Sequence, residues 1–117
     1  NNGAGNEIRI PLTSWASCTG LASARGILEL RAMSNTDLEV MLCLEFADYP
    51  DQDGTLDMIT LGAWQSTEGI HYPTVWNTIS AKTDQNQLFR VCVEVRRKTG
   101  TGLEMCRVAG RVELKSA

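Results

Sequence analysis

Cysteine is the residue type best suited to covalent chemistry in this sequence, and the chain has 4 cysteines. An even number permits a disulfide framework. None of their spacings resembles the close Cys-x-x-Cys pairs of a structural zinc site, so we expect no zinc and no other cofactor. Cys43 and Cys92 each lie in a stretch of alternating apolar and polar residues, Leu38–Phe46 and Phe89–Arg96. Because side chains alternate sides along a β-strand, both cysteines are expected on the polar face of a half-buried strand.

Three arrangements are open for Cys43 and Cys92. If the two strands are neighbours and the cysteines lie opposite each other at a non-hydrogen-bonded position, a cross-strand disulfide can form on the solvent face. Alternatively, each thiol faces a neighbouring subunit, or both thiols stay unpaired on a face that another part of the protein covers. Disulfides persist in oxidising compartments, so we expect an extracellular, periplasmic or virion-surface location.

Acidic residues gather around Gly54. Asp51, Asp53 and Asp57 form a shortened version of a calcium-binding loop, in which alternating carboxylates surround a hard cation. The loop lacks a third alternating ligand before the glycine and the distal bidentate glutamate. Asp53-Gly54 is also a common hairpin turn. We therefore expect a turn there, with a weak calcium site as the alternative.

Three aromatic residues, Trp64, Tyr72 and Trp76, lie on either side of one turn, where they can gather into an exposed platform that stacks on sugar rings. The alternative is that these large side chains fill the core and the ends of the fold. His71 is the only histidine of the chain, and no serine or cysteine lies in a nucleophile motif. We expect a protein that is not an enzyme.

Short strands must position these residues, because alternation and turn signals recur along the chain and no helical periodicity is present. The expected strands are Glu7–Leu12, Leu21–Met33, Leu38–Phe46, Thr55–Trp64, Ile70–Ile79, Leu88–Arg97 and Leu103–Leu114. The pattern predicts an all-β protein, an antiparallel β-sandwich of seven or eight strands connected as a jelly-roll or as an immunoglobulin-like Greek key. A closed barrel is the second choice.

The length of 117 residues fits one domain. Residues 1–6 are small and polar and are expected to form a flexible N-terminal arm, with a single sandwich domain over residues 7–117. The net charge of −3 comes from interspersed acidic and basic residues, so no nucleic-acid partner is expected. No apolar run approaches the roughly 20 residues that a membrane-spanning helix needs.

Together these features predict a structural or assembly subunit, either a virion coat or decoration protein or the repeating unit of an extracellular filament or sheath. Copies of the chain are expected to associate into homo-oligomers through strand edges and through residues 1–12, which can add a strand to a neighbour. The residues expected in that interface are Ile8, Ile10, Leu12, Ile27, Met33 and Met41. The alternative function is a carbohydrate-binding or adhesion module that uses the aromatic residues or the acidic loop.

Overall fold

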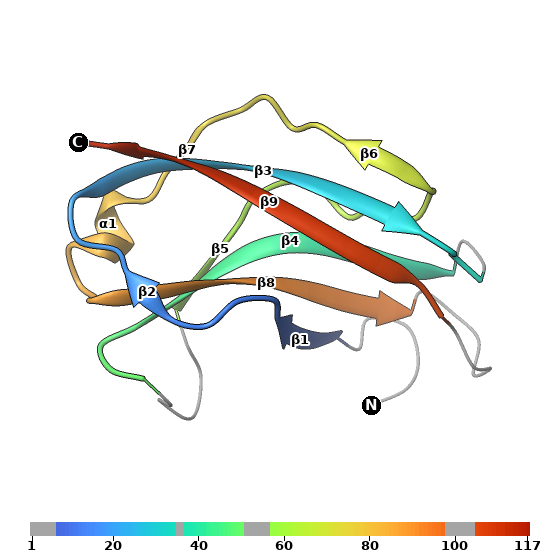
Figure 1. Cartoon of the computed structure of the whole chain (residues 1–117), viewed down its shortest axis with the longest axis horizontal. Helices are drawn as coiled ribbons and strands as arrows, with labels where there is room; N and C mark the ends of the chain where they lie inside the picture. Colours follow the sequence, from blue (N-terminus) through green and yellow to red (C-terminus); the bar gives the residue numbers. More distant parts are fainter. Residues whose placement is uncertain (1–6, 35–36, 51–56, 98–104) are drawn as a thin grey trace.

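The computed structural model describes residues 7–34, 37–50, 57–97 and 105–117, which form two packed β-sheets (Figure 1). The strands are β1 (Glu7–Pro11), β2 (Ala16–Ser17), β3 (Leu21–Arg31), β4 (Leu38–Ala47), β5 (Asp57–Thr60), β6 (Gly69–His71), β7 (Asn77–Thr78), β8 (Leu88–Arg97) and β9 (Arg107–Ser116). One short helix, α1 (Ser80–Thr83), lies between β7 and β8. The predicted antiparallel β-sandwich is confirmed.

The described residues form nine strands rather than seven or eight. One reason is that Ala16–Ser17 adds a short strand, β2, within a segment where we expected a loop. The other is that the expected strand over residues 70–79 divides into β6 and β7. Pro73 lies in the interval between them and has no backbone N–H to give to a ladder.

The first sheet, sheet A, has the strand order β1-β8-β4-β5, and β2 also pairs with β8. The second sheet, sheet B, has β3 at its centre. There β9 pairs along one edge of β3, whereas β6 and β7 pair with separate parts of the other edge. All of these pairings are antiparallel. The longest ladders are therefore β4–β8 in sheet A and β3–β9 in sheet B.

The core lies between these two ladders. On β4, the buried side chains that face it are Val40, Leu42, Leu44 and Phe46. They meet buried side chains of β3, among them Leu28 and Leu30. This alternation is the one that the sequence predicts for the apolar face of β4.

Gly26 of β3 lies where the two sheets approach closely. A Cβ atom on Gly26 would be 2.4 Å from Cδ2 of Leu42 and 3.2 Å from Cβ of Leu61. Non-bonded carbon atoms do not approach to 2.4 Å in a close-packed core, so a side chain here would displace Leu42. Glycine at this position therefore sets the distance between β3 and β4.

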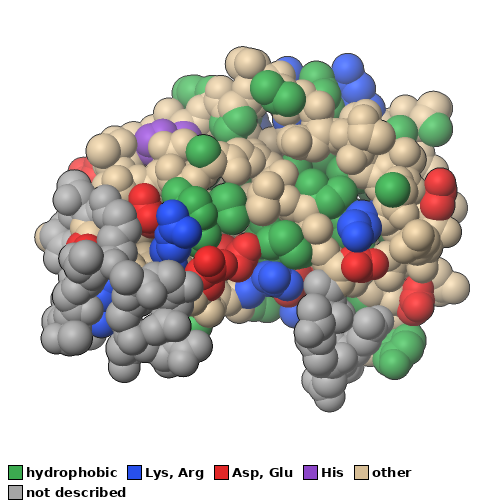
Figure 2. All heavy atoms as spheres, turned by 180° about the vertical axis from the view of Figure 1, so that it is seen from behind, with side chains coloured by type: hydrophobic (Ala, Val, Ile, Leu, Met, Phe, Trp, Pro, Cys, Tyr) green, Lys and Arg blue, Asp and Glu red, His purple; other side chains and the backbone are tan. Residues whose placement is uncertain are grey.

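The other face of β4 is buried as well. The strand is therefore buried on both faces, whereas the sequence predicted burial of one face only. Met41, Cys43 and Glu45 lie on this outer face of sheet A, and their exposed fractions are 8%, 0% and 5%. Seen from behind (Figure 2), acidic and basic side chains lie next to one another, with hydrophobic side chains exposed among them. Among the described residues, no helix is long and apolar enough to cross a lipid bilayer.

Candidate functional site

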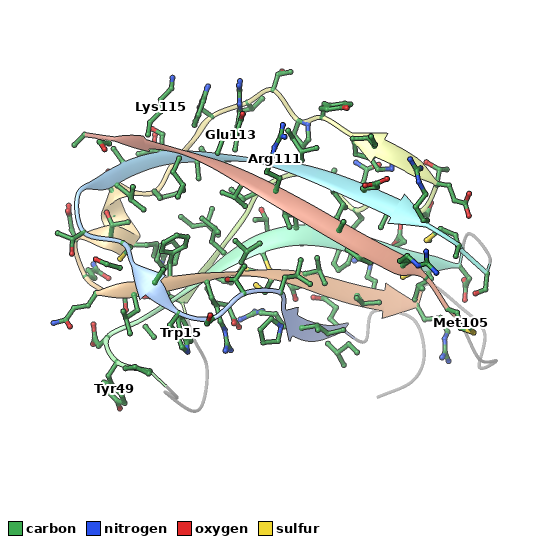
Figure 3. All side chains as sticks on the ribbon, viewed as in Figure 1. Trp15, Tyr49, Met105, Arg111, Glu113 and Lys115 are labelled. Atoms are coloured by element: carbon green, nitrogen blue, oxygen red, sulfur yellow. The ribbon has the colours of Figure 1, made fainter. Side chains whose placement is uncertain are left out.

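Arginine and tryptophan side chains cover the outer face of sheet A. The guanidinium of Arg90 lies 4.3 Å from the ring centroid of Trp15, and that of Arg96 lies 4.0 Å from the ring of Trp64. Trp15 projects from the segment between β1 and β2 toward the side of sheet A that faces away from sheet B (Figure 3). Each contact places a cation over an aromatic face, which is attractive when the pair is partly desolvated.

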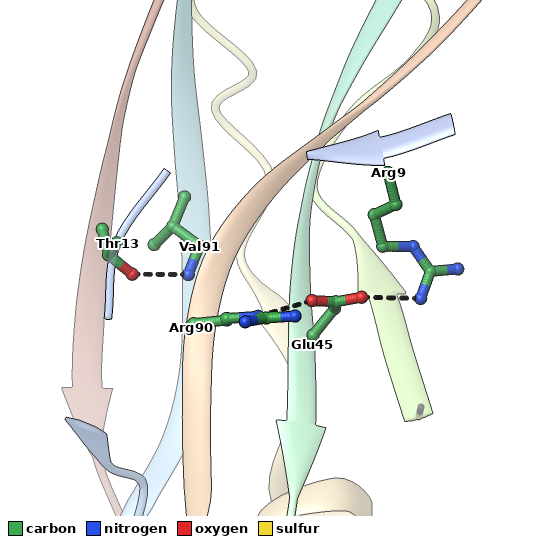
Figure 4. Close-up of polar contacts among 5 residues, drawn as sticks. All are labelled: Arg9, Thr13, Glu45, Arg90 and Val91. Atoms are coloured by element: carbon green, nitrogen blue, oxygen red, sulfur yellow. Dashed lines mark hydrogen bonds and ion pairs between the residues drawn. The ribbon is translucent and has the colours of Figure 1, made fainter. Parts of the chain in front are cut away.

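Glu45 joins three strands on this covered face (Figure 4). Its carboxylate accepts from Arg9 of β1 at 3.0 Å and from Arg90 of β8 at 2.7 Å. Because Glu45 is almost completely buried, these two partners compensate a charge that would otherwise be costly. The bridge also fixes the edge strand β1 to the centre of sheet A.

Cys43 and Cys92 lie beneath this layer, directly opposite each other in the β4–β8 ladder. Both side chains have an exposed fraction of 0%, and both thiols are free. The disulfide on a solvent face, one of the three arrangements left open, is therefore not formed, and the third arrangement, unpaired thiols under a cover, is the one observed. A hydrogen bond with the Cys43 side chain raises the pKa of Cys92, and burial raises it further. The Cys92 thiol therefore stays protonated.

The backbone explains why no disulfide joins these cysteines. Val40 exchanges backbone hydrogen bonds with Gln65, and Leu42 accepts from Leu61, all on the β5 side of β4. Since successive amides point to opposite edges of a strand, those of Cys43 point to β8. The pair thus occupies a hydrogen-bonded position, where opposed side chains are farther apart than at the non-hydrogen-bonded position that we assumed.

One side of the sandwich is open, because β1 has no strand of sheet B above it. Ile8 and Ile10 lie opposite Val95 and Val93 of β8, on the face of sheet A that is turned toward sheet B. Even so, Ile8 is 56% exposed and Ile10 is 42% exposed, and the adjacent Leu12 is 38% exposed. These three residues, which we call the β1 strip, form an uncovered apolar surface.

A groove of about 630 Å³ continues the β1 strip into the open side. Its lining residues are Leu12, Thr13, Ser14, Ala16, Phe89, Val91, Val108, Ala109, Gly110, Arg111, Val112 and Leu114. The segment after β1 forms one wall. Leu12 N–H donates to the carbonyl of Val91 there, and Thr13 Oγ1 accepts from the N–H of Val91 (Figure 4). The opposite wall is β9.

The outer edge of β9 carries backbone groups that no strand in the described part of the chain pairs with. Ile79 N–H donates to the carbonyl of Ala22, so the backbone groups of Ala22 point toward β7. Those of Ala24, two residues further along, point the same way. Leu114, the β9 partner of Ala24, is then at a non-hydrogen-bonded position, and its amide points away from β3. By the same alternation, the outward amides are those of Val108, Gly110, Val112 and Leu114.

The predicted interface residues fall into separate places. Ile8, Ile10 and Leu12 lie together on the open side, as described. Three others lie elsewhere. Ile27 is half-buried on the outer face of sheet B, Met41 is buried in the outer face of sheet A, and Met33 packs against the core.

The predicted aromatic platform is divided between the two sheets. Trp64 lies against Arg96 of sheet A, whereas Trp76 lies against Arg25 of β3 and Lys115 of β9 in sheet B, with ring centroids 4.5 Å and 4.1 Å away. Tyr72 is 62% exposed. Sequence reasoning missed the cations on the tryptophan rings, because strand order decides which arginine meets which ring.

The acidic loop is described only in part. Asp51 and Asp53 lie outside the described residues. The Asp57 carboxylate accepts from Lys82 and from Asn86, both at 3.3 Å, and these bonds hold the pKa of Asp57 below its usual value. Within residues 7–34, 37–50, 57–97 and 105–117, no three histidine, cysteine or acidic side chains are grouped as metal ligands.

The described residues thus define an antiparallel β-sandwich with an open apolar side, an unpaired strand edge and a buried pair of thiols. No family model, curated protein or solved structure matches this chain. The geometry of the open side is therefore the basis for assigning a function.

Proposed function

We propose that this protein is a non-enzymatic structural subunit whose copies associate through the open side of the sandwich. The observation that carries the proposal is that the β1 strip and the unpaired edge of β9 border the same groove. An exposed strand edge is a template for pairing with another chain, and a contiguous apolar surface beside it favours a permanent partner.

A strand from a second copy, placed beside β9, would satisfy both features at once. It would accept and donate hydrogen bonds with the outward amides of β9. It would also extend sheet B toward β1, whose isoleucine side chains are exposed on the face of sheet A that is turned toward sheet B. The side chains of such a strand would cover Ile8, Ile10 and Leu12.

The gain from covering the β1 strip is moderate. Full burial of an isoleucine or leucine side chain contributes about 1.5–3 kcal/mol, and these three side chains are about half exposed. The gain is therefore roughly half of that value for each residue. Backbone pairing along β9 and filling of the groove must supply the rest, because association itself costs several kcal/mol of lost freedom.

Exchange of the N-terminal segment is not required for this association. Residues 7–11 pair with β8 of their own chain, and Arg9 bonds to Glu45 there. In the proposed assembly β1 stays in place and contributes its apolar face. A virion coat or decoration protein, or an extracellular filament or sheath, is the setting that we propose for such a subunit.

The test is the mass of the native particle in solution, measured by light scattering over a range of concentrations. The variant I8K/I10K places two charges on the β1 strip, and we expect it to be a folded monomer while the unmodified chain is an oligomer. The matched control is I70K/V75K, because Ile70 and Val75 are exposed apolar residues of similar accessibility, 43% and 67%, outside the open side. A monomeric unmodified chain, or equal effects of both double variants, would overturn the proposal.

A further inference from the structure

Two shallow hollows lie side by side on the outer face of sheet B. Their volumes are about 210 Å³ and 220 Å³. Ile27, Tyr72 and Arg111 line both of them, so these three residues form the ridge that the hollows share. Glu29 lines one hollow and Glu113 lines the other.

Arg111 supplies a positive charge without a hydrogen-bonded partner among the described residues. Its closest acidic neighbour along β9 is Glu113, whose carboxylate is already bonded to Arg25. That bond, and the nearby charge of Arg111, hold the pKa of Glu113 below its usual value. Arg111, Glu113 and Lys115 project from the same side of β9 (Figure 3), and Arg107 shares that side by strand alternation. The face therefore carries more basic than acidic groups along this strand.

Tyr72 supplies an aromatic surface between the hollows. Its exposed fraction of 62% is large for a tyrosine that lines two adjoining hollows. An aromatic side chain with a hydroxyl presents an apolar face and a polar tip, which suits the face of a sugar ring. Ile27, half-buried beneath it, gives the hollows an apolar floor.

The acidic side chains that line the hollows restrict which kind of anionic ligand can bind there. Glu29 is paired with Arg31 and Glu113 with Arg25, each through one carboxylate oxygen. The second oxygen of each carboxylate can accept a hydrogen bond from a hydroxyl group, and both carboxylates repel closely spaced phosphates. The chain as a whole has a net charge of −3, which opposes the phosphate neutralisation on which nucleic-acid affinity depends. A ligand with many hydroxyls and an occasional carboxylate fits Glu29, Tyr72 and Arg111 together, because arginine binds a carboxylate through two parallel hydrogen bonds.

We infer that the outer face of sheet B binds an acidic oligosaccharide in which uronic-acid units alternate with neutral sugars. Successive sugar rings occupy the two hollows, Tyr72 contacts the face of a ring, and Arg111 binds a carboxylate. Hydroxyl groups donate to Glu29. Of the three ridge residues, Ile27 and Tyr72 lie outside the groove on the open side, whereas Arg111 lines both the groove and the hollows. The Y72A variant described below therefore tests this site separately from the proposed self-association.

The experiment is titration calorimetry of the full chain with a panel of tetrasaccharides in which uronic-acid and neutral units alternate. A neutral tetrasaccharide and a short single-stranded DNA serve as comparison ligands. We expect weak binding of at least one acidic tetrasaccharide and at least tenfold weaker binding of both comparison ligands. Each of Y72A and R111Q should weaken the binding about tenfold or more.

Two control variants separate a built site from general surface attraction. Tyr49 is as exposed as Tyr72, at 61%, and Arg107 lies on the same face of β9 as Arg111 but lines neither hollow. We expect Y49A and R107Q to bind as the unmodified chain does. The inference is wrong if no acidic tetrasaccharide binds, if DNA binds more tightly than the sugar, or if R107Q weakens binding as much as R111Q.

Discussion

Cys43 and Cys92 face each other across the β4–β8 ladder as two free thiols, at a hydrogen-bonded position where opposed side chains are farther apart than at a non-hydrogen-bonded one. Their burial comes from the layer of arginine, glutamate and tryptophan side chains above them. The same layer explains why a face that reads as polar in sequence lies inside the protein.

Thiol reactivity should follow this burial. In the native protein at pH 8 we expect iodoacetamide to label Cys106 first, because it is the one cysteine that is only half-buried. Cys18, whose thiol donates to the carbonyl of Asn86 at 3.3 Å, should be protected together with Cys43 and Cys92. In urea all 4 cysteines should react. Mass spectrometry counts the labels. A mass lower by two hydrogens before labelling would instead indicate a disulfide and contradict the structure.

Glu94 should make the protein less stable at neutral pH than its glutamine variant. Burial raises the pKa of Glu94, and the hydrogen bond to Glu7 raises it further, although Arg9 opposes the shift. A raised pKa means that the folded state binds the proton more tightly, so stability is greatest below the unfolded pKa and falls as the pH rises through the folded one. We expect E94Q to raise the urea midpoint at pH 7 and to have little effect near pH 3. A lower midpoint at pH 7 would show that Arg9 outweighs burial.

Glu45 should hold β1 in place. We expect E45Q to cost about 2 kcal/mol of the free energy of unfolding, because it weakens two charge-assisted hydrogen bonds to a buried group. Hydrogen exchange at the Leu12 amide, which donates to Val91 beside β1, should become faster. The control is D57N, which weakens an exposed pair with Lys82 and should cost about 0.5 kcal/mol or less. Equal costs for the two variants would argue against a special role of Glu45.

The spacing between β3 and β4 should depend on Gly26. We expect G26A to cost about 1–3 kcal/mol, since the added methyl group overlaps Leu42. Shortening Leu42 to valine in the same chain should recover part of the loss, whereas L42V alone should be destabilising. Urea unfolding of both single variants and the double variant gives the coupling between the two positions. Additive costs would show that the two side chains do not meet.

The fold class followed from the sequence because the alternation of apolar residues in β4 and β8 is strict and has one interpretation. The number of strands did not, because a two-residue strand such as β2 leaves no periodic signal. The interruption near Pro73 was visible, but a bulge or edge position and a break in the strand give the same pattern.

The site could be predicted only in part. Ile8, Ile10 and Leu12 carry an apolar alternation at one end of the sandwich, and this is enough to suggest an exposed strip. The edge of β9 could not be found, because its exposure depends on which strand lies beside it. The sequence placed Cys43 and Cys92 on the correct face, as candidates for a cross-strand pair. Whether the pair lies at a hydrogen-bonded position depends on which edge of β4 the backbone groups of Val40 and Leu42 face, and no side-chain pattern encodes this.

The strand order also decides when the chain can fold as it is synthesised. β1 pairs with β8 and β3 pairs with β9, so each sheet joins an early strand to a late one. The ribosome adds about 5–20 residues per second, and roughly 80 residues separate β1 from its partner, so β1 waits about 4–16 s with its isoleucines exposed. Neither sheet can close until β8 and β9 have been made. A growing chain of this protein therefore leaves β1 and one edge of β3 unpaired until β8 and β9 have been synthesised.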